Sequence, residues 1–213
     1  MSLEKIHFVT SSNFKREENA ILASRGLLSD GTPIAEAFEF VLVRNSVLET
    51  LEPNLERMVI AEAKAAYGVL RKPCIVEHAG LVFDDYAEAG YPGGLTKPMW
   101  NTLRDQFLTE THSADRPATA RAIIGYCDGK HVYTFSGESR GRLSSTPRGA
   151  RGFYWDTIFV PDDKNSEAMT YAEIVESKGL EFKVLELSQS TKAMMEFLHW
   201  RLENSPDLWS LEY

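Results

Sequence analysis

The residues Thr10–Lys15 read Thr-Ser-Ser-Asn-Phe-Lys and place hydroxyl, amide and ammonium groups between a predicted strand and a predicted helix. The first turn of a helix exposes N–H groups without intrahelical partners at the positive end of the helix dipole, so anions bind there readily. Lys15 adds a full positive charge within that turn. The segment therefore predicts a phosphate site, and an ordinary Ser/Thr/Asn helix cap is the alternative interpretation.

Glu77 and His78 place a carboxylate beside an imidazole within Glu77–Gly80. Apolar residues at Cys74–Glu77 and Leu81–Phe83 predict two short strands that bracket this group. Strand ends in open α/β sheets are common ligand sites, and these two side chains are able to hold a metal ion and to activate water. In the structural alternative, Glu77 pairs with a nearby Lys or Arg and His78 is a loop residue with satisfied polar atoms.

A third segment, Gly152–Asp156, combines three aromatic rings with a carboxylate. Recognition of a purine requires a ring on which the base stacks and polar groups that contact the edge of the base. The aromatic residues of this segment are equally suited to fill a core. Each of the three segments is therefore ambiguous when it is considered alone.

The composition limits the classes of protein to which the chain can belong. The 213 residues are enough for one substantial core, or for a core with a cleft between two lobes. The formal net charge of −8 argues against a general nucleic-acid binder, which needs a basic surface. A few focused Lys and Arg residues with a metal ion still suffice to hold one triphosphate. The charge therefore indicates a small ligand.

The chain shows no feature of a membrane or secreted protein. No apolar run reaches the length that crosses a bilayer, and the first five residues lack the pattern of a signal peptide. We therefore expect a cytoplasmic protein without membrane contacts. Cys74 and Cys127 lie far apart in the sequence without metal-ligand spacing, and we predict that both are reduced core thiols.

The elements that position these segments alternate between strands and helices. Asp128-Gly129 is the strongest hairpin signal in the chain. The order predicts one α/β domain over residues 1–213, in which a long mixed β-sheet is flanked by helices and two lobes enclose a cleft. The predicted strands are Lys5–Thr10, Phe38–Val43, Cys74–Glu77, Leu81–Phe83, Ala118–Cys127 and Lys130–Ser136. The predicted helices are Phe14–Leu27, Asn54–Leu70, Trp100–Leu108, Thr170–Ser177 and Ser190–Asn204. A loop rich in Gly and Arg is expected to follow the hairpin and to lead to Gly152–Val160.

In their order along the chain, the segments resemble the inosine triphosphate pyrophosphatase family, which removes non-standard purine nucleotides. Thr10–Lys15 resembles the Thr-Gly-Asn-x-x-Lys turn of that family, and Glu77–Leu81 resembles its acidic-acidic-Ser/Thr-Gly-Leu segment. Pro92–Thr96, with Lys97 just after it, is similar to the family's Pro-Gly-x-Tyr-Ser loop. The resemblance extends over nearly the whole chain.

The resemblance is densest between residues 141 and 173. The family's Gly-Arg, Pro-Arg-Gly and Gly-Phe-Gly-Trp-Asp-Pro-x-Phe series is matched by Gly141-Arg142, Pro147–Gly149 and Gly152–Phe159. Thr170–Glu173 is similar to the family's Thr-Tyr/Phe-Ala-Glu. A chance match of such an ordered series is improbable, and the family implies a two-lobed fold with a nucleotide cleft, Mg²⁺, homodimers and release of pyrophosphate.

The resemblance also implies roles for individual residues. Lys15, Glu77 and His78 would carry catalysis, and Glu49 and Glu77 would bind the metal ion, although the position of Glu49 depends on a loose alignment. Phe153 would stack on the base. The residues implied in substrate binding are Thr10, Ser12, Asn13, Gly93, Lys97, Phe153, Trp155, Asp156, Ser190, Thr191 and Lys192.

The chain departs from the family pattern at several of these positions. His78 stands where the family has a second acidic residue that activates water, and a neutral imidazole is able to accept that proton. Thr191-Lys192 replaces a His-Arg pair, which removes a planar two-pronged contact and changes the expected base preference. The family's Lys shortly before that pair has Lys183 as its nearest counterpart. These departures leave three alternatives to the predicted hydrolase: a nucleotide-binding protein without catalysis, a hydrolase of a pyrimidine or modified nucleotide, and an interaction protein.

Overall fold

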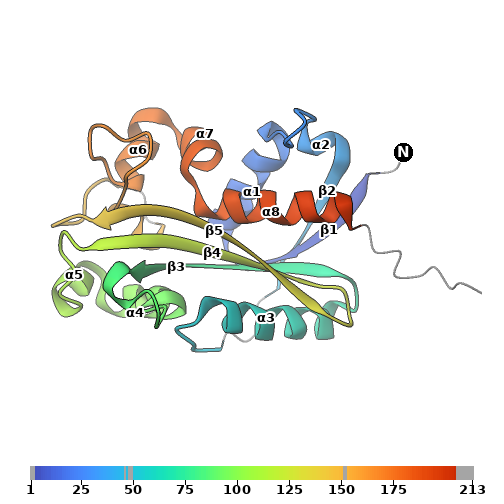
Figure 1. Ribbon diagram of the computed structural model, residues 1–213, viewed down its shortest axis with the longest axis horizontal. Coiled ribbons are helices and arrows are strands. Elements are labelled where there is room, and N and C mark those ends of the chain that lie inside the picture. Colours follow the sequence, from blue (N-terminus) through green and yellow to red (C-terminus); the bar gives the residue numbers. More distant parts are fainter. Residues whose placement is uncertain (1–2, 46, 48–49, 151–152, 205–213) are drawn as a thin grey trace, which may run out of the picture.

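The computed structural model describes residues 3–45, 47, 50–150 and 153–204 (Figure 1). Its strands form one six-stranded sheet in the order β2-β1-β3-β4-β5-β6. Their bounds are β1 Glu4–Val9, β2 Phe38–Val43, β3 Cys74–Phe83, β4 Pro117–Cys127, β5 Val132–Leu143 and β6 Phe159–Pro161. The helices are α1 Asn13–Arg25, α2 Ile34–Ala37, α3 Leu55–Leu70, α4 Thr96–Leu103, α5 Phe107–Glu110, α6 Tyr171–Lys178, α7 Leu180–Phe182 and α8 Gln189–Glu203, with a π-helix at Lys183–Leu187.

The sheet is mixed, as the sequence predicts. Strand β1 runs parallel to β2 and β3, and the pairs from β3 to β6 are antiparallel. Figure 1 shows α3, α4 and α5 on one face of the sheet and α1, α2, α6, α7 and α8 on the other. The expected α/β architecture of a mixed sheet flanked by helices is therefore confirmed.

Local sequence explains why the helices beside the sheet begin where they do. The side chain of Ser12 accepts a hydrogen bond from the backbone N–H of Lys15 at 3.3 Å and caps α1. Asn54 caps α3 in the same way through the N–H of Arg57, at 3.0 Å. Thr170 forms a reciprocal capping box with α6. These caps satisfy N–H groups that the helices leave without partners.

Apolar side chains of both helical layers pack on the sheet. Helix α3 presents a buried stripe to one face, and α1 and α8 cover the other face around Phe8 and Ile75. A further cluster surrounds Trp155 and Tyr171 where α4, α5 and α6 meet the far end of β3 and β4. The buried residues of α3 are Leu55, Met58, Val59, Ala63 and Ala66, which follow helical spacing.

The structure corrects three predicted elements. Strand β3 is continuous from Cys74 to Phe83, so Glu77–Gly80 lies within a strand and not between two, because every residue of β3 pairs with β4. Strand β5 continues to Leu143 through the segment predicted as a Gly- and Arg-rich loop, since β4 and β6 hold it on both sides. The predicted helix Trp100–Leu108 is divided into α4 and α5.

The two cysteines are free and buried, which confirms the prediction of reduced core thiols. Cys74 and Cys127 lie opposite each other in the β3–β4 register. Burial, with a smaller contribution from the neighbouring Cys127, raises the pKa of Cys74 to about 12. A thiol with so high a pKa stays protonated at neutral pH and is a poor nucleophile.

No helix among the residues that the structure describes is both long and apolar enough to cross a membrane.

Gly137 allows α8 to lie directly on β5. A Cβ atom at this position would come within 2.1 Å of the carbonyl oxygen of Gln189 and 2.4 Å of the backbone nitrogen of Ala193. We expect Gly137→Ala to lower the free energy of unfolding by about 1–3 kcal/mol, because the backbone of α8 has to move. Urea denaturation measures this change. Gly68→Ala in α3 is the matched control, since its Cβ would meet no atom within 4 Å; equal effects of both changes would contradict the interpretation.

Candidate active site

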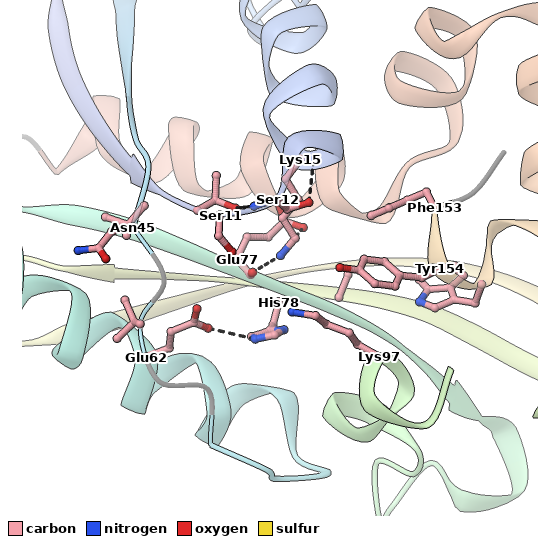
Figure 2. A pocket seen from close by; sticks show the side chains of 15 residues that line it. Ser11, Ser12, Lys15, Asn45, Glu62, Glu77, His78, Lys97, Phe153 and Tyr154 are labelled. Carbon is pink, nitrogen blue, oxygen red and sulfur yellow. Dashed lines mark hydrogen bonds and ion pairs between the residues drawn. The ribbon is translucent and has the colours of Figure 1, made fainter. Parts of the chain in front are cut away.

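One pocket brings together the three segments that the sequence identifies (Figure 2). The turn before α1, the middle of β3 and the residues before β6 all contribute side chains to it. The pocket is lined by Val9, Thr10, Ser11, Ser12, Lys15, Asn45, Val47, Glu62, Glu77, His78, Ala79, Lys97, Phe153, Tyr154 and Trp155. Segments far apart in sequence, from Val9 to Trp155, thus share one site, as the predicted function requires.

The pocket forms because β1 and β3 pair over only a short stretch. They pair at His7–Cys74 and Phe8–Ile75, and β1 ends at Val9. Beyond that point no strand of the described residues pairs with the edge of β3 that faces away from β4, and Glu77, His78 and Ala79 line the pocket there. A crevice beyond the carboxyl end of a parallel strand is the usual ligand position in open α/β sheets.

The turn before α1 supplies the positive end of the pocket. Lys15 donates a hydrogen bond through Nζ to the backbone oxygen of Glu77, and the same Nζ lies 3.9 Å from Oε1 of the Glu77 carboxylate. Ser12 caps the helix, and the hydroxyl of Thr10 accepts from the backbone N–H of Ser12 at 3.2 Å. Anionic groups that enter the pocket therefore meet an ammonium and a helix N-terminus together.

Glu77 and His78 point to opposite faces of β3, because successive side chains of a strand alternate (Figure 2). Glu77 lies toward α1 and α8 and accepts a hydrogen bond from Oγ of Ser190 at 2.8 Å. His78 lies toward α3, with Nε2 3.1 Å from Oε2 of Glu62. Both residues are buried, with 8% and 5% of their surface exposed. The carboxylate and the imidazole therefore serve the two sides of one pocket.

Aromatic rings form the wall opposite the edge of β3. Phe153 packs against Phe14 of α1, with ring centroids 4.9 Å apart. The centre of the Tyr154 ring lies 6.0 Å from Nζ of Lys97, and the Lys97 side chain extends toward His78 (Figure 2). Offset stacking of a further planar ring on such faces is favourable. The cations of Lys15 and Lys97 and the aromatic wall thus line one cavity.

A buried ionic cluster supports the aromatic wall. Nζ of Lys183 lies 2.9 Å from Oε1 of Glu18 and 3.0 Å from Oδ2 of Asp156, and only 1% of the Lys183 side chain is exposed. The same ammonium lies 5.2 Å from the centre of the Phe153 ring. Burial alone would lower the pKa of Lys183, but the charges of Asp156 and Glu18 outweigh it and raise that pKa above its usual value. Lys183 is therefore a charged residue at any ordinary pH.

The predicted residues of α8, Ser190, Thr191 and Lys192, do not all face the same pocket. Ser190 and Thr191 line a smaller adjoining pocket that shares Lys15 and Glu77 with the first. Lys192 points instead to β5 and donates through Nζ to the backbone oxygen of Glu138 at 2.9 Å.

Among the described residues, three further predicted positions do not line the main pocket. Asn13 is exposed and accepts hydrogen bonds from Arg16 and Arg44. Gly93 packs against the Pro53 backbone, and Asp156 lies beneath Phe153 in the ionic cluster. Glu49 lies outside the described residues.

Sequence reasoning missed Glu62, Glu18 and Tyr154. Glu62 lies on α3 among residues with ordinary helical spacing, and no local pattern connects it with His78. Glu18 follows the Thr10–Lys15 turn by one helical turn, yet its partner Lys183 is 165 residues away. Tyr154 was part of the recognised aromatic segment, and its contact with Lys97 depends on tertiary structure alone.

The chain is similar to known proteins along most of its length. Residues 6–200 match the model of the Ham1 family. A dITP/XTP pyrophosphatase of Methanopyrus kandleri is 35% identical over 159 residues, which cover 73% of this chain and 79% of the relative. Another dITP/XTP pyrophosphatase, from Pyrococcus horikoshii, is 30% identical over 92% of this chain and 96% of its own length. An inosine triphosphate pyrophosphatase of Scheffersomyces stipitis is 31% identical, over 81% of this chain and 87% of the relative.

Solved structures share the fold. The Ham1 protein of Staphylococcus aureus aligns with a TM-score of 0.63 at 21% identity, covering 93% of this chain and 99% of that chain. A HAM1 protein from Coxiella burnetii aligns with a TM-score of 0.64 at 17% identity, covering 93% and 100%. The family model spans most of the sequence, and relatives of 30% identity or more align along most of both chains. On these grounds the chain belongs to the Ham1 family.

Proposed function

We propose that the protein hydrolyses a non-standard purine nucleoside triphosphate to the nucleoside monophosphate and pyrophosphate. The observation that carries the proposal is the shared pocket, in which Lys15, Glu77 and Phe153 meet. The names of the relatives, dITP/XTP pyrophosphatase and inosine triphosphate pyrophosphatase, describe the same reaction class. Cations at one end and aromatic rings at the other suit a triphosphate joined to a planar base.

The proposed reaction is an attack of water on the α-phosphorus. The new bond joins the water oxygen to that phosphorus, and the bond from the phosphorus to the α–β bridging oxygen breaks, so that pyrophosphate leaves with the bridging oxygen. Lys15 stabilises the negative charge that grows on the leaving group. The proton of the attacking water passes to His78, or to Glu77 through a second water.

Mg²⁺ is the expected cofactor, and the described residues of the pocket supply some of the ligands that it needs. Glu77 supplies a carboxylate on the pocket wall, which suits a hard cation that also binds substrate phosphates. Among the described residues no group of three or more His, Cys, Asp or Glu side chains gathers as a complete metal site. We propose that Glu77 and Glu49 hold the ion. When bound, it offsets phosphate charge and makes the α-phosphorus more electrophilic.

Binding without turnover is the second candidate function. Two observations favour it: His78 stands where the resemblance implies an acidic residue, and Lys192 points to β5 and not into the pocket. The cations and the aromatic wall would still hold a nucleotide in that case.

We further propose that the protein is a homodimer in the cytoplasm and that it acts on a free nucleotide and not on nucleic acid or membranes.

A panel of nucleoside triphosphates tests the proposed reaction. Purified protein is incubated with Mg²⁺ and with ITP, XTP, dITP, the four standard ribonucleotides and modified pyrimidine nucleotides, and monophosphate and pyrophosphate are quantified. We expect hydrolysis of the inosine and xanthosine nucleotides first. Binding of several nucleotides without any hydrolysis would refute the enzyme and leave the binding protein. A bound nucleotide at a hundredfold its Kd should raise stability by about 2.7 kcal/mol, and absence of that shift refutes both.

A further inference from the structure

Asn19 takes no part in the reaction described so far. It lies on α1 and lines the smaller pocket, which shares Lys15 and Glu77 with the main pocket. Lys15, Asn19 and Leu22 follow helical spacing and therefore lie on one face of α1, and all three line the smaller pocket. The face of α1 that carries the cation of the site thus also carries an amide.

The amide of Asn19 is buried, and its donors are unpaired within the protein. Asn19 is 5% exposed, and Nδ2, which carries two N–H donors, has no hydrogen-bond partner among the described residues. A buried donor without an acceptor lowers the stability of a folded protein. Such a donor in the wall of a ligand pocket is explained if a bound molecule supplies the acceptor.

The aromatic wall lies beside this smaller pocket. Phe153, on which the base is expected to stack, packs against Phe14 of α1 with ring centroids 4.9 Å apart. Nζ of Lys183 lies 5.2 Å from the centre of the Phe153 ring and 2.9 Å from Oε1 of Glu18, and Glu18 lines the smaller pocket. The edge of a base stacked on Phe153 is therefore close to the smaller pocket.

The charges of the two pockets assign the phosphates to one and the base to the other. Among the described lining residues, the main pocket has Lys15 and Lys97 against Glu62 and Glu77, and it includes the N-terminal turn of α1. The described lining of the smaller pocket has Lys15 against Glu18 and Glu77. Phosphates are therefore favoured in the main pocket, and an uncharged base is favoured in the smaller one.

Side chains of α8 that the resemblance implies in reading the base are engaged elsewhere. Nζ of Lys192 donates to the backbone oxygen of Glu138 at 2.9 Å, and Oγ of Ser190 donates to Oε1 of Glu77 at 2.8 Å. The N–H groups of Asn19 are available to an acceptor on the ligand. In purines the 6-carbonyl oxygen is an acceptor, whereas the 6-amino group of adenine is a donor.

We propose that Asn19 is a specificity-determining residue, which donates from Nδ2 to the 6-carbonyl oxygen of a hypoxanthine or xanthine base and so disfavours adenine. Adenine would place its own N–H donors against those of Asn19 and leave both without acceptors. A site that hydrogen-bonds its ligand rejects an analogue that lacks the bonding group, because a buried polar group is then left unpaired. Guanine carries the same carbonyl, so this contact separates 6-oxopurines from adenine and not from one another. The inference rests on the proposed function, which places a nucleotide in these pockets.

Asn19→Leu tests this role, because it keeps the approximate shape of the side chain and removes the donor. Titration calorimetry with Mg²⁺ uses the α,β-methylene analogues of ITP and ATP, which the proposed reaction cannot cleave. We expect the Kd of the ITP analogue to rise about 5- to 50-fold and the Kd of the ATP analogue to change less than about threefold. We also expect the urea midpoint of the ligand-free protein to stay level or rise, because an unpaired buried donor is removed. Asn19→Ala adds no bulk to the pocket and should change the two Kd values in the same way.

Asn165→Leu is the matched control at an asparagine with a structural role. Nδ2 of Asn165 donates to the backbone oxygens of Pro161 at 2.9 Å and Met169 at 2.8 Å. Asn165 lines neither of the two pockets. We expect this control to lower the urea midpoint and to leave the ratio of the two Kd values unchanged.

Equal changes of the two Kd values in the Asn19 variants, or no change in either, overturn the proposal. A urea midpoint that falls as far in Asn19→Leu as in Asn165→Leu also overturns it, because the amide would then hold the fold. If the wild type binds the ITP analogue and cleaves no triphosphate, the proposed hydrolysis fails, and the two Kd values still decide the role of Asn19. If the wild type binds neither analogue, the nucleotide site is refuted, and the role of Asn19 is refuted with it.

Discussion

Replacing Glu77 with Gln is expected to lower kcat about 10²- to 10⁴-fold while the protein stays folded. Glu77 is 8% exposed, and its carboxylate lies 3.9 Å from Nζ of Lys15 and accepts from Ser190. Gln retains the size and one acceptor oxygen, so the contact with Ser190 survives. It removes the negative charge that the proposed chemistry needs beside the triphosphate. Steady-state kinetics on the best nucleotide of the panel measure the loss, and a thermal melt checks that the fold is intact.

Glu39→Gln provides the matched control for that substitution. Glu39 pairs with Lys5 at 3.6 Å on an exposed part of β1 and β2, so the same loss of charge occurs far from the pocket. We expect wild-type turnover, since exposed ion pairs contribute little. Turnover in Glu77→Gln equal to that of the control would refute the role assigned to Glu77. A fall in both variants would indicate an effect of net charge on the whole protein.

The parts of the site that were predictable from sequence are those with a local signature. Thr10–Lys15 is a strand end, a cap and a cation within six residues, and the structure shows each of these features. The aromatic segment was recognisable from composition in the same way. Their meeting in one pocket was inferred from order along the chain and from resemblance to a family, and the structure brings them together.

The parts that were not predictable depend on partners far away in sequence. A strand break was predicted at Glu77–Gly80 because the segment contains polar residues and Gly, yet β4 pairs along its whole length. At Gly80 the absence of a side chain is required, since a Cβ atom would lie 2.1 Å from the backbone oxygen of Gly93. Local propensity yields to such pairing in a buried strand. The contact between Glu62 and His78 is of the same kind.

The extension of β5 illustrates the same limit. Glu138, Arg140 and Arg142 are exposed, and the residues between them are buried, so this part of the strand alternates as a sheet with one solvated face should. Gly141 hides the pattern, because Gly and Arg together suggest a loop. The strand is held there by β4 and β6, and β6 is only three residues long.

Lys183→Met is expected to cost about 3–5 kcal/mol of stability, because it leaves two carboxylates in the protein interior without their shared cation. The side chain of Asp156 is 1% exposed and that of Glu18 is 9% exposed. Met keeps much of the length and apolar stem of Lys, so the loss comes from charge and not from a cavity. For a chain of 213 residues we expect Tm to fall by roughly 6–20 °C. Thermal and urea denaturation measure both quantities.

The stability difference between the wild type and Lys183→Met depends on pH because the pKa of Lys183 is raised. A group whose pKa is higher in the folded protein stabilises it fully below the unfolded value, and the contribution disappears as pH rises through the folded value. The gap between wild type and variant should therefore stay constant through the neutral range and narrow only in strong alkali. Lys164→Met is the control, since it removes a cation from an exposed pair with Glu186, and we expect little change.

A combined variant decides whether loss of the shared cation is the cause. Adding Glu18→Gln and Asp156→Asn to Lys183→Met removes the charges of both carboxylates and leaves neutral groups of nearly the same shape. We expect this triple variant to be more stable than Lys183→Met alone, because replacing a whole buried ionic cluster costs far less than breaking it. If the triple variant is as unstable as the single one, packing around Phe153 and Tyr171 accounts for the loss, since both rings lie within 5.2 Å of the ammonium. Recovery of stability without recovery of nucleotide binding would show that the cluster positions Phe153 for the base in addition to holding the fold.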